Sequence, residues 1–118
     1  MQFDEMRFPD AQPVDGYGPG FFRVGGEVHR GRLLILPVAG VRPWGGYEDT
    51  ALILAEAQRL DVLFVGTGPE IAYLPTGFRA VMDDAGLPVE QMPTPQACRT
   101  YNVLLSEGRR VGLALFPL

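Results

Sequence analysis

The chain has 118 residues, of which 47% are hydrophobic and 20% charged, and it carries a formal net charge of −4. This length and composition predict a single folded domain spanning residues 1–118, with a core that buries roughly two-thirds of the unfolded surface. The acidic balance argues against a nucleic-acid-binding protein, and no apolar run approaches the roughly 20 residues of a membrane-spanning helix, so we expect a cytoplasmic protein.

The N-terminal half begins with a predicted arm. Residues 1–15 mix polar, acidic and proline positions without period, which indicates a loosely ordered segment. Gly25 and Gly26 allow the positive φ of a tight turn and predict a hairpin around them. The unbroken apolar run at 33–38 indicates a strand covered on both faces. The predicted elements are hairpin strands at 21–24 and 27–30, a strand at 33–38, a loop at 40–46 and a helix at 48–59.

The C-terminal half alternates strands and helices. Thr76 and Thr94 are predicted to cap two helices, Pro95 to open the second, and Gly86 and Gly108 to end them. Strands are predicted at 61–65, 88–92 and 111–116. Alternation of this kind predicts an α/β fold with a mainly parallel central sheet and helices packed against it.

A parallel sheet would bring three loops to one edge. Loops 40–46, 66–75 and 93–98 would all follow carboxyl ends of strands, where open α/β sheets bind ligands and helix N-termini attract anions by about 0.3 to 1 kcal/mol each. Gly66-Thr67-Gly68 resembles the start of a dinucleotide-binding turn, but the third glycine of that motif would fall at Ile71. An ordinary sharp turn is the alternative interpretation.

The residue inventory excludes several chemistries. The chain has no lysine and a single residue each of His29, Cys98 and Ser106. It therefore lacks a Schiff-base lysine and a Walker-type phosphate loop, and one His with one Cys argues against a zinc site. We expect no metal and no cofactor. Cys98 is predicted to face the core as a small hydrophobe, although the first turn of a helix also lowers a thiol pKa and leaves a nucleophile as the alternative.

An ordered set of motifs resembles a known family. The motifs run from Phe22-Arg23-Val24-Gly25-Gly26 through Val62-Leu63-Phe64-Val65-Gly66-Thr67-Gly68 and Met92-Pro93-Thr94 to Ala97-Cys98-Arg99-Thr100-Tyr101-Asn102. Together they resemble the family of mitochondrial respiratory complex I assembly factor 3 and its bacterial and archaeal stand-alone relatives. The resemblance implies a three-layer α/β fold with an additional N-terminal β-hairpin layer, and it transfers no catalytic residues.

Two functions from different classes follow. The first is a non-catalytic assembly or adaptor protein that binds another protein and is linked to the biogenesis of a respiratory or membrane complex. The alternative is a small-molecule or anion-binding domain, or a weak enzyme, that uses the carboxyl-end edge of the sheet; a homo-oligomer is a third interpretation. The candidate binding residues are Gly66, Thr67, Gly68, Cys98, Arg99, Tyr101, Asn102 and Trp44, with Tyr47 beside Trp44.

Overall fold

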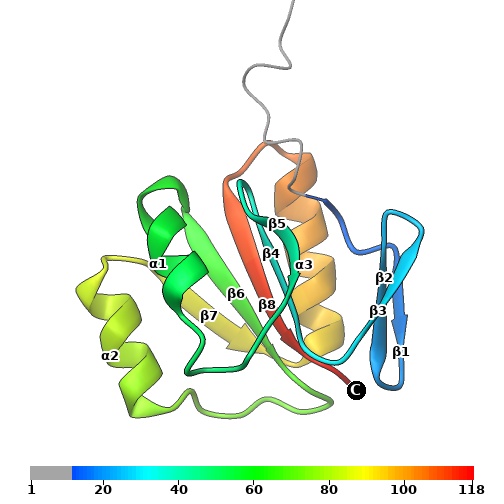
Figure 1. Cartoon of the computed structure of the whole chain (residues 1–118), viewed down its shortest axis with the longest axis horizontal. Coiled ribbons are helices and arrows are strands. Elements are labelled where there is room, and N and C mark those ends of the chain that lie inside the picture. Colours follow the sequence, from blue (N-terminus) through cyan, green and yellow to red (C-terminus); the bar gives the residue numbers. More distant parts are fainter. Residues whose placement is uncertain (1–11) are drawn as a thin grey trace, which may run out of the picture.

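The computed structural model describes residues 12–118 and places two β-sheets side by side with helices around the larger one (Figure 1). Residues 1–11, the greater part of the predicted arm, lie outside the described residues. Within the described range, every helix is too short or too polar to cross a membrane. The observed α/β class agrees with the sequence prediction.

The smaller sheet is an antiparallel meander of β1 (Gly16–Gly18), β2 (Phe21–Val24) and β3 (Glu27–Arg30). Its β2–β3 hairpin confirms the prediction from the two glycines, since Gly25 and Gly26 have φ of 59° and 82°. Strand β1 was not predicted, because three residues containing two glycines carry no alternating pattern.

The larger sheet has the order β5-β4-β8-β6-β7, built from β4 (Leu33–Leu36), β5 (Gly40–Pro43), β6 (Val62–Thr67), β7 (Val89–Met92) and β8 (Val111–Phe116). It is mixed, which corrects the prediction of a mainly parallel sheet: β6 runs parallel to β7 and β8, but β4 is antiparallel to both β5 and β8. A turn too short for a crossover joins β4 to β5, and such a connection permits only antiparallel pairing.

The helices are α1 (Ala51–Glu56), which continues as a short 3₁₀ helix η2 (Ala57–Arg59), then α2 (Thr76–Asp84) and α3 (Thr94–Ser106). The predicted N-caps are wrong: the cap positions are Pro75 and Pro93, and neither helix has a side-chain cap hydrogen bond. The predicted stops are correct, because Gly86 and Gly108 adopt φ of 72° and 81° directly after the helices.

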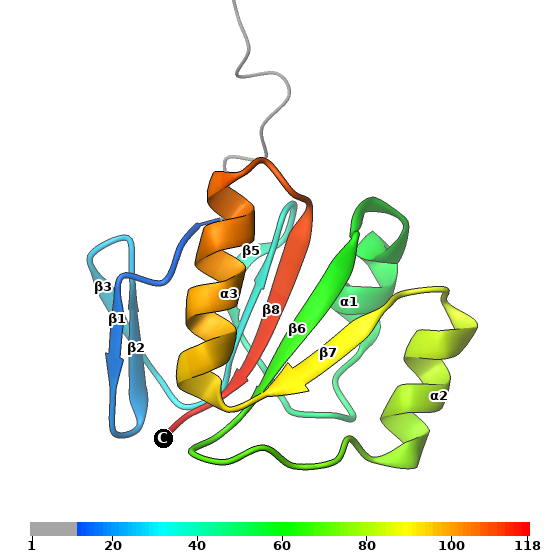
Figure 2. The ribbon, with the colours of Figure 1, turned by 180° about the vertical axis from the view of Figure 1, so that it is seen from behind.

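Two apolar clusters cover the opposite faces of the larger sheet. On one face α1 and α2 pack against the sheet, and on the other α3 packs beside the small sheet (Figure 2). The strand side chains alternate between them, so that Leu33 and Ile35 belong to one cluster and Leu34 and Leu36 to the other. This coverage explains why β4 reads as an unbroken apolar run even though it is antiparallel to its neighbours.

A buried acid joins α1 to the β4–β5 turn. The carboxylate of Glu56 accepts hydrogen bonds from the backbone N–H groups of Val38 at 2.8 Å and Ala39 at 2.6 Å. Glu56 is buried, and these backbone donors compensate for the removal of its carboxylate from water. The contact fixes the hairpin whose far end carries the loop described below.

Candidate binding site

Hydrogen bonds with the buried residue Thr94 hold the predicted Gly66-Thr67-Gly68 turn in place. The hydroxyl of Thr94 accepts a hydrogen bond from the Gly68 N–H at 2.8 Å and donates one to the Phe116 carbonyl at 2.6 Å, while the Thr94 N–H donates to the Gly68 carbonyl at 2.8 Å. A Cβ on Gly66 would lie 2.8 Å from the Thr94 hydroxyl oxygen. These contacts tie the ends of β6, β7 and β8 together, which gives the two glycines and Thr94 a structural role.

Helix α3 buries two of its four predicted candidates, Cys98 and Tyr101. Cys98 is 2% exposed, and burial raises the pKa of its thiol to about 12 although the Arg99 guanidinium opposes that shift. The thiol is therefore protonated at neutral pH, which disfavours a nucleophile. Burial also raises the pKa of Tyr101, whose hydroxyl donates to the Gln12 carbonyl at 2.8 Å.

Asn102 holds the start of the described chain. Its side-chain amide donates to the Val14 carbonyl and its side-chain oxygen accepts from the Val14 N–H, both at 2.9 Å. Residues 12–14, which the sequence assigns to a loosely ordered arm, are therefore held against α3, and Val14 is buried. Arg99 is exposed on the same helix. The recognition role of Arg99 and Asn102 stays a prediction.

A cleft of about 780 Å³ opens between the loop after β5, the carboxyl end of β8 and helix α2. The loop after β5 forms one wall and the start of α2 the other. Its lining residues are Arg32, Gly45, Gly46, Tyr47, Glu48, Thr50, Pro75, Gly77, Phe78, Val81 and Phe116. The loop reaches this edge because β5, which the sequence analysis assigned to a loop, carries the chain across the molecule first.

An aromatic cluster forms the floor of the cleft. The ring centroids of Tyr47 lie 4.9 Å from Phe116, 5.1 Å from Phe78 and 5.6 Å from Trp44. Trp44 is buried beneath them, and its indole N–H donates to the Asp49 carbonyl at 3.0 Å. Burial raises the pKa of Tyr47. Rings packed in tilted and edge-to-face contacts make a rigid apolar floor.

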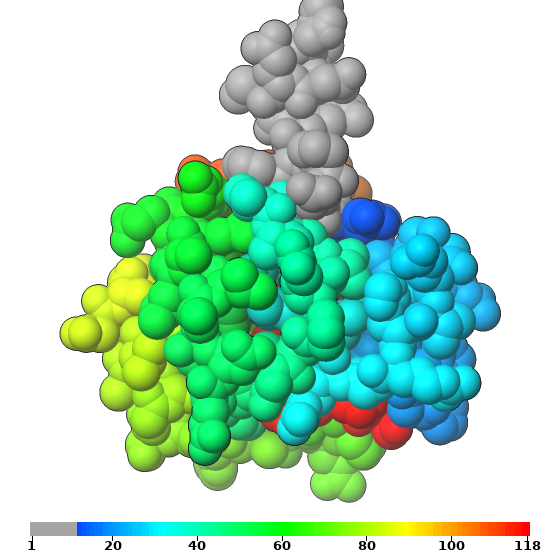
Figure 3. Space-filling model, viewed as in Figure 1, coloured from blue at the N-terminus to red at the C-terminus, as the bar shows by residue number. Residues whose placement is uncertain are grey.

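Exposed apolar side chains continue from the cleft. The segment between β6 and α2 runs along the lower rim of the molecule (Figure 3). Pro75 at the end of this segment lines the cleft. In this segment Tyr73 is 96% exposed and Ile71 64% exposed, and Val81 on the cleft wall is 38% exposed. Exposed large apolar side chains on a cleft wall and on the segment leading to it are typical of interaction surfaces.

The cleft lies at the edge that the sequence predicted for a binding site, but most of its lining residues were not among the predicted candidates. Trp44 and Tyr47 were candidates, whereas Arg32, Phe78, Val81 and the exposed pair Ile71 and Tyr73 were not. One signal was available, since three large apolar residues stand between Pro69 and Pro75 in a segment that no periodicity assigns to a helix or strand. No group of three or more His, Cys, Asp or Glu within residues 12–118 is arranged to hold a metal ion.

Comparisons with known proteins place the chain in a family. It is 52% identical to an uncharacterized protein of Rhodobacter capsulatus over 97% of this chain and 91% of that protein. It is 32% identical to the mouse NADH dehydrogenase [ubiquinone] 1 alpha subcomplex assembly factor 3, covering 96% of this chain but only 64% of that protein. The crystal structure of a Bartonella henselae protein described as an outer membrane protein has a TM-score of 0.84 and 36% identity, and covers 94% of this chain and 98% of that one. The sequence model described as "Protein of unknown function (DUF498/DUF598)" matches residues 14–116, and the chain belongs to this family.

Proposed function

We propose that this protein is a non-catalytic assembly factor that binds another protein through the carboxyl-end edge of its larger sheet. The observation that carries the proposal is a cleft with an aromatic floor, together with the exposed apolar residues Ile71 and Tyr73 in the segment that leads to Pro75 at its lining. Tyrosine and other aromatic side chains frequently anchor protein interfaces, and exposing them to water without a partner is unfavourable.

The relatives support the direction of the proposal. The mouse protein named as an assembly factor of NADH dehydrogenase matches 96% of this chain. We infer the same kind of task here, namely that the chain binds a subunit of a respiratory NADH dehydrogenase while the complex is being built. The protonated, buried Cys98 is consistent with a binding role rather than with nucleophilic catalysis.

The experiment replaces the relative in Rhodobacter capsulatus with this chain. We expect deletion of the 52% identical relative to reduce the amount of assembled NADH dehydrogenase on native gels, and this chain to restore it. The double variant Ile71→Ser/Tyr73→Ser should fail to restore assembly although it folds, because both side chains are exposed. Val103→Ser, which changes a 55% exposed residue on α3, is the matched control. An unchanged level of the complex in the deletion strain would contradict the assembly role.

A small-molecule or anion-binding domain is the second candidate function. Arg32 at the cleft and the aromatic floor beneath it favour this alternative, since a guanidinium and apolar walls suit an organic carboxylate. Its distinguishing result would be a cellular metabolite that copurifies with the wild type and is lost in Arg32→Gln, together with normal assembly in the Ile71→Ser/Tyr73→Ser strain. The exposed Tyr73 outside the cleft favours the protein partner.

A further inference from the structure

Arg32 is fixed at the cleft by its backbone. It stands immediately before β4, and its carbonyl accepts a hydrogen bond from the Trp44 N–H at 3.2 Å, which ties it to the loop after β5. One guanidinium nitrogen lies 3.4 Å from the position that a Cβ on Gly46 would occupy. Gly46 has φ of 97°, a conformation that favours glycine. Glycine at this position therefore both permits the turn and leaves space for the Arg32 side chain.

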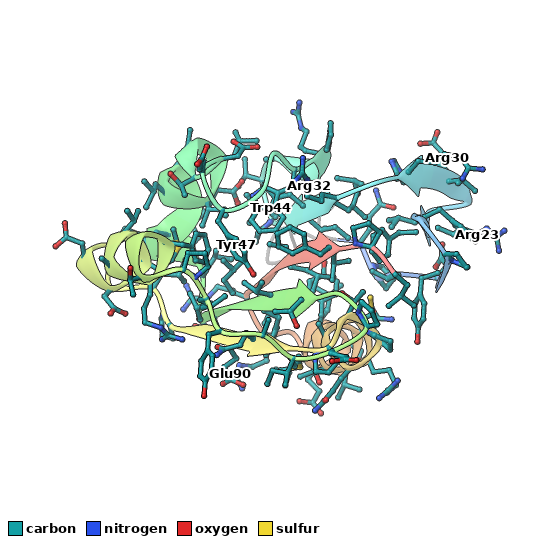
Figure 4. All side chains as sticks on the ribbon, turned by 90° about the horizontal axis from the view of Figure 1, so that it is seen from below. Arg23, Arg30, Arg32, Trp44, Tyr47 and Glu90 are labelled. Atoms are coloured by element: carbon teal, nitrogen blue, oxygen red, sulfur yellow. The ribbon has the colours of Figure 1, made fainter. Side chains whose placement is uncertain are left out.

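The charge of Arg32 is not neutralised within the described chain. No carboxylate of residues 12–118 lies within 4.0 Å of its guanidinium, although Arg109 and Arg110 both pair with Asp61 elsewhere. Figure 4 shows Arg32 beside Trp44 and Tyr47, with Arg23 and Arg30 on the small sheet to one side. Glu48 is the one acid in the cleft lining.

The cleft also has an apolar part within reach of that arginine. Phe78, Val81 and Phe116 line it together with Tyr47, which supplies a floor for an apolar side chain. A guanidinium forms paired, charge-assisted hydrogen bonds with a carboxylate, and these carry more geometric selectivity than a lysine would. The apolar floor and the Arg32 guanidinium together favour a ligand that has an apolar group next to an anionic group.

We propose that the cleft binds a segment of the partner protein in which an apolar side chain is flanked by an Asp or Glu. The apolar side chain packs onto the floor that Tyr47 and Phe78 form, and the carboxylate pairs with Arg32. This inference rests on the proposed function, because it names the chemistry of the partner that the assembly factor binds. The exposed Ile71 and Tyr73 extend the contact beyond the cleft, which suits a polypeptide better than a free anion.

In-cell photo-crosslinking tests the proposal. A photo-reactive amino acid replaces Val81 in the protein expressed in the complemented Rhodobacter capsulatus strain, and the crosslinked peptide is sequenced. We expect a partner peptide with an Asp or Glu next to the crosslinked apolar residue. Arg32→Glu should reduce the crosslink yield about tenfold, as expected for loss of a charged hydrogen-bonded pair. Arg59→Glu is the matched control, since Arg59 is exposed in η2 at the opposite edge.

Three results would overturn the inference: a crosslinked peptide without an acid, a yield that Arg32→Glu leaves unchanged, or a crosslink only to another part or copy of this same protein. A second photo-reactive probe at Tyr73 separates the two proposals. Crosslinks to a partner from position 73 but not from position 81 would refute the acidic segment in the cleft and leave the assembly function standing. The absence of any partner crosslink at both positions would contradict both proposals.

Discussion

Replacing Thr94 with valine should destabilise the fold by removing one oxygen atom. Valine keeps the shape of threonine but leaves the buried Gly68 N–H without its acceptor and the Phe116 carbonyl without its donor. An unsatisfied buried polar group costs about 1 to 3 kcal/mol, so we expect the free energy of unfolding to fall by about 2 to 3 kcal/mol. Thr94→Ser keeps the hydroxyl and loses one buried methyl group, which costs about 1 kcal/mol.

Urea unfolding measures both variants. Trp44 is the only tryptophan and is buried, so its fluorescence reports unfolding directly. The expected order of stability is wild type, then Thr94→Ser, then Thr94→Val. A Thr94→Val midpoint equal to that of the wild type, or a serine variant less stable than the valine variant, would refute the hydrogen-bond account of this strand junction.

Three further outcomes follow from the structure. Gly66→Ala should lower the free energy of unfolding by about 1 to 3 kcal/mol in the same assay, because the new Cβ would lie 3.0 Å from the Thr94 Cα. The N–H and guanidinium of Arg110 hold the pKa of Asp61 below its usual 3.8; Asp61→Asn should therefore be less stable than the wild type at neutral pH, and acid titration should show the difference disappearing as pH falls below about 3.8. Cys98, with a pKa of about 12, should react with a thiol reagent far more slowly in buffer than in concentrated urea, and equal rates would contradict its burial.

The sequence determines most of the elements because their signals are local. Apolar runs mark β6 and β8, and the glycine pair marks the β2–β3 turn. Strand β5 escaped prediction because it begins with Gly40 and ends with Pro43, and proline is tolerated there only because β5 is an edge strand. The direction of β4 relative to its neighbours could not be predicted either, because a strand buried on both faces has the same apolar sequence in parallel and antiparallel pairing.

The candidate site depends on contacts that no local pattern encodes. Thr94 looks like a helix cap, but its hydroxyl is used by Gly68 and Phe116, which lie 26 and 22 residues away. Arg32 and Val81 meet at one cleft only because the mixed sheet brings the start of β4 and the face of α2 to the same edge. The order of elements along the chain predicted which edge of the sheet would carry the loops. The residues that line the cleft at this edge could be identified only from the three-dimensional structure.

Binding of the partner in the cleft can be tested by comparing two charge reversals for the amount of assembled NADH dehydrogenase that each restores in the Rhodobacter capsulatus deletion strain. Arg32→Glu changes the cleft and Arg59→Glu changes the opposite edge by the same charge. We expect Arg59→Glu to restore the complex as fully as the wild type and Arg32→Glu not to restore it. Equal restoration by both variants would contradict the claim that this cleft binds the partner.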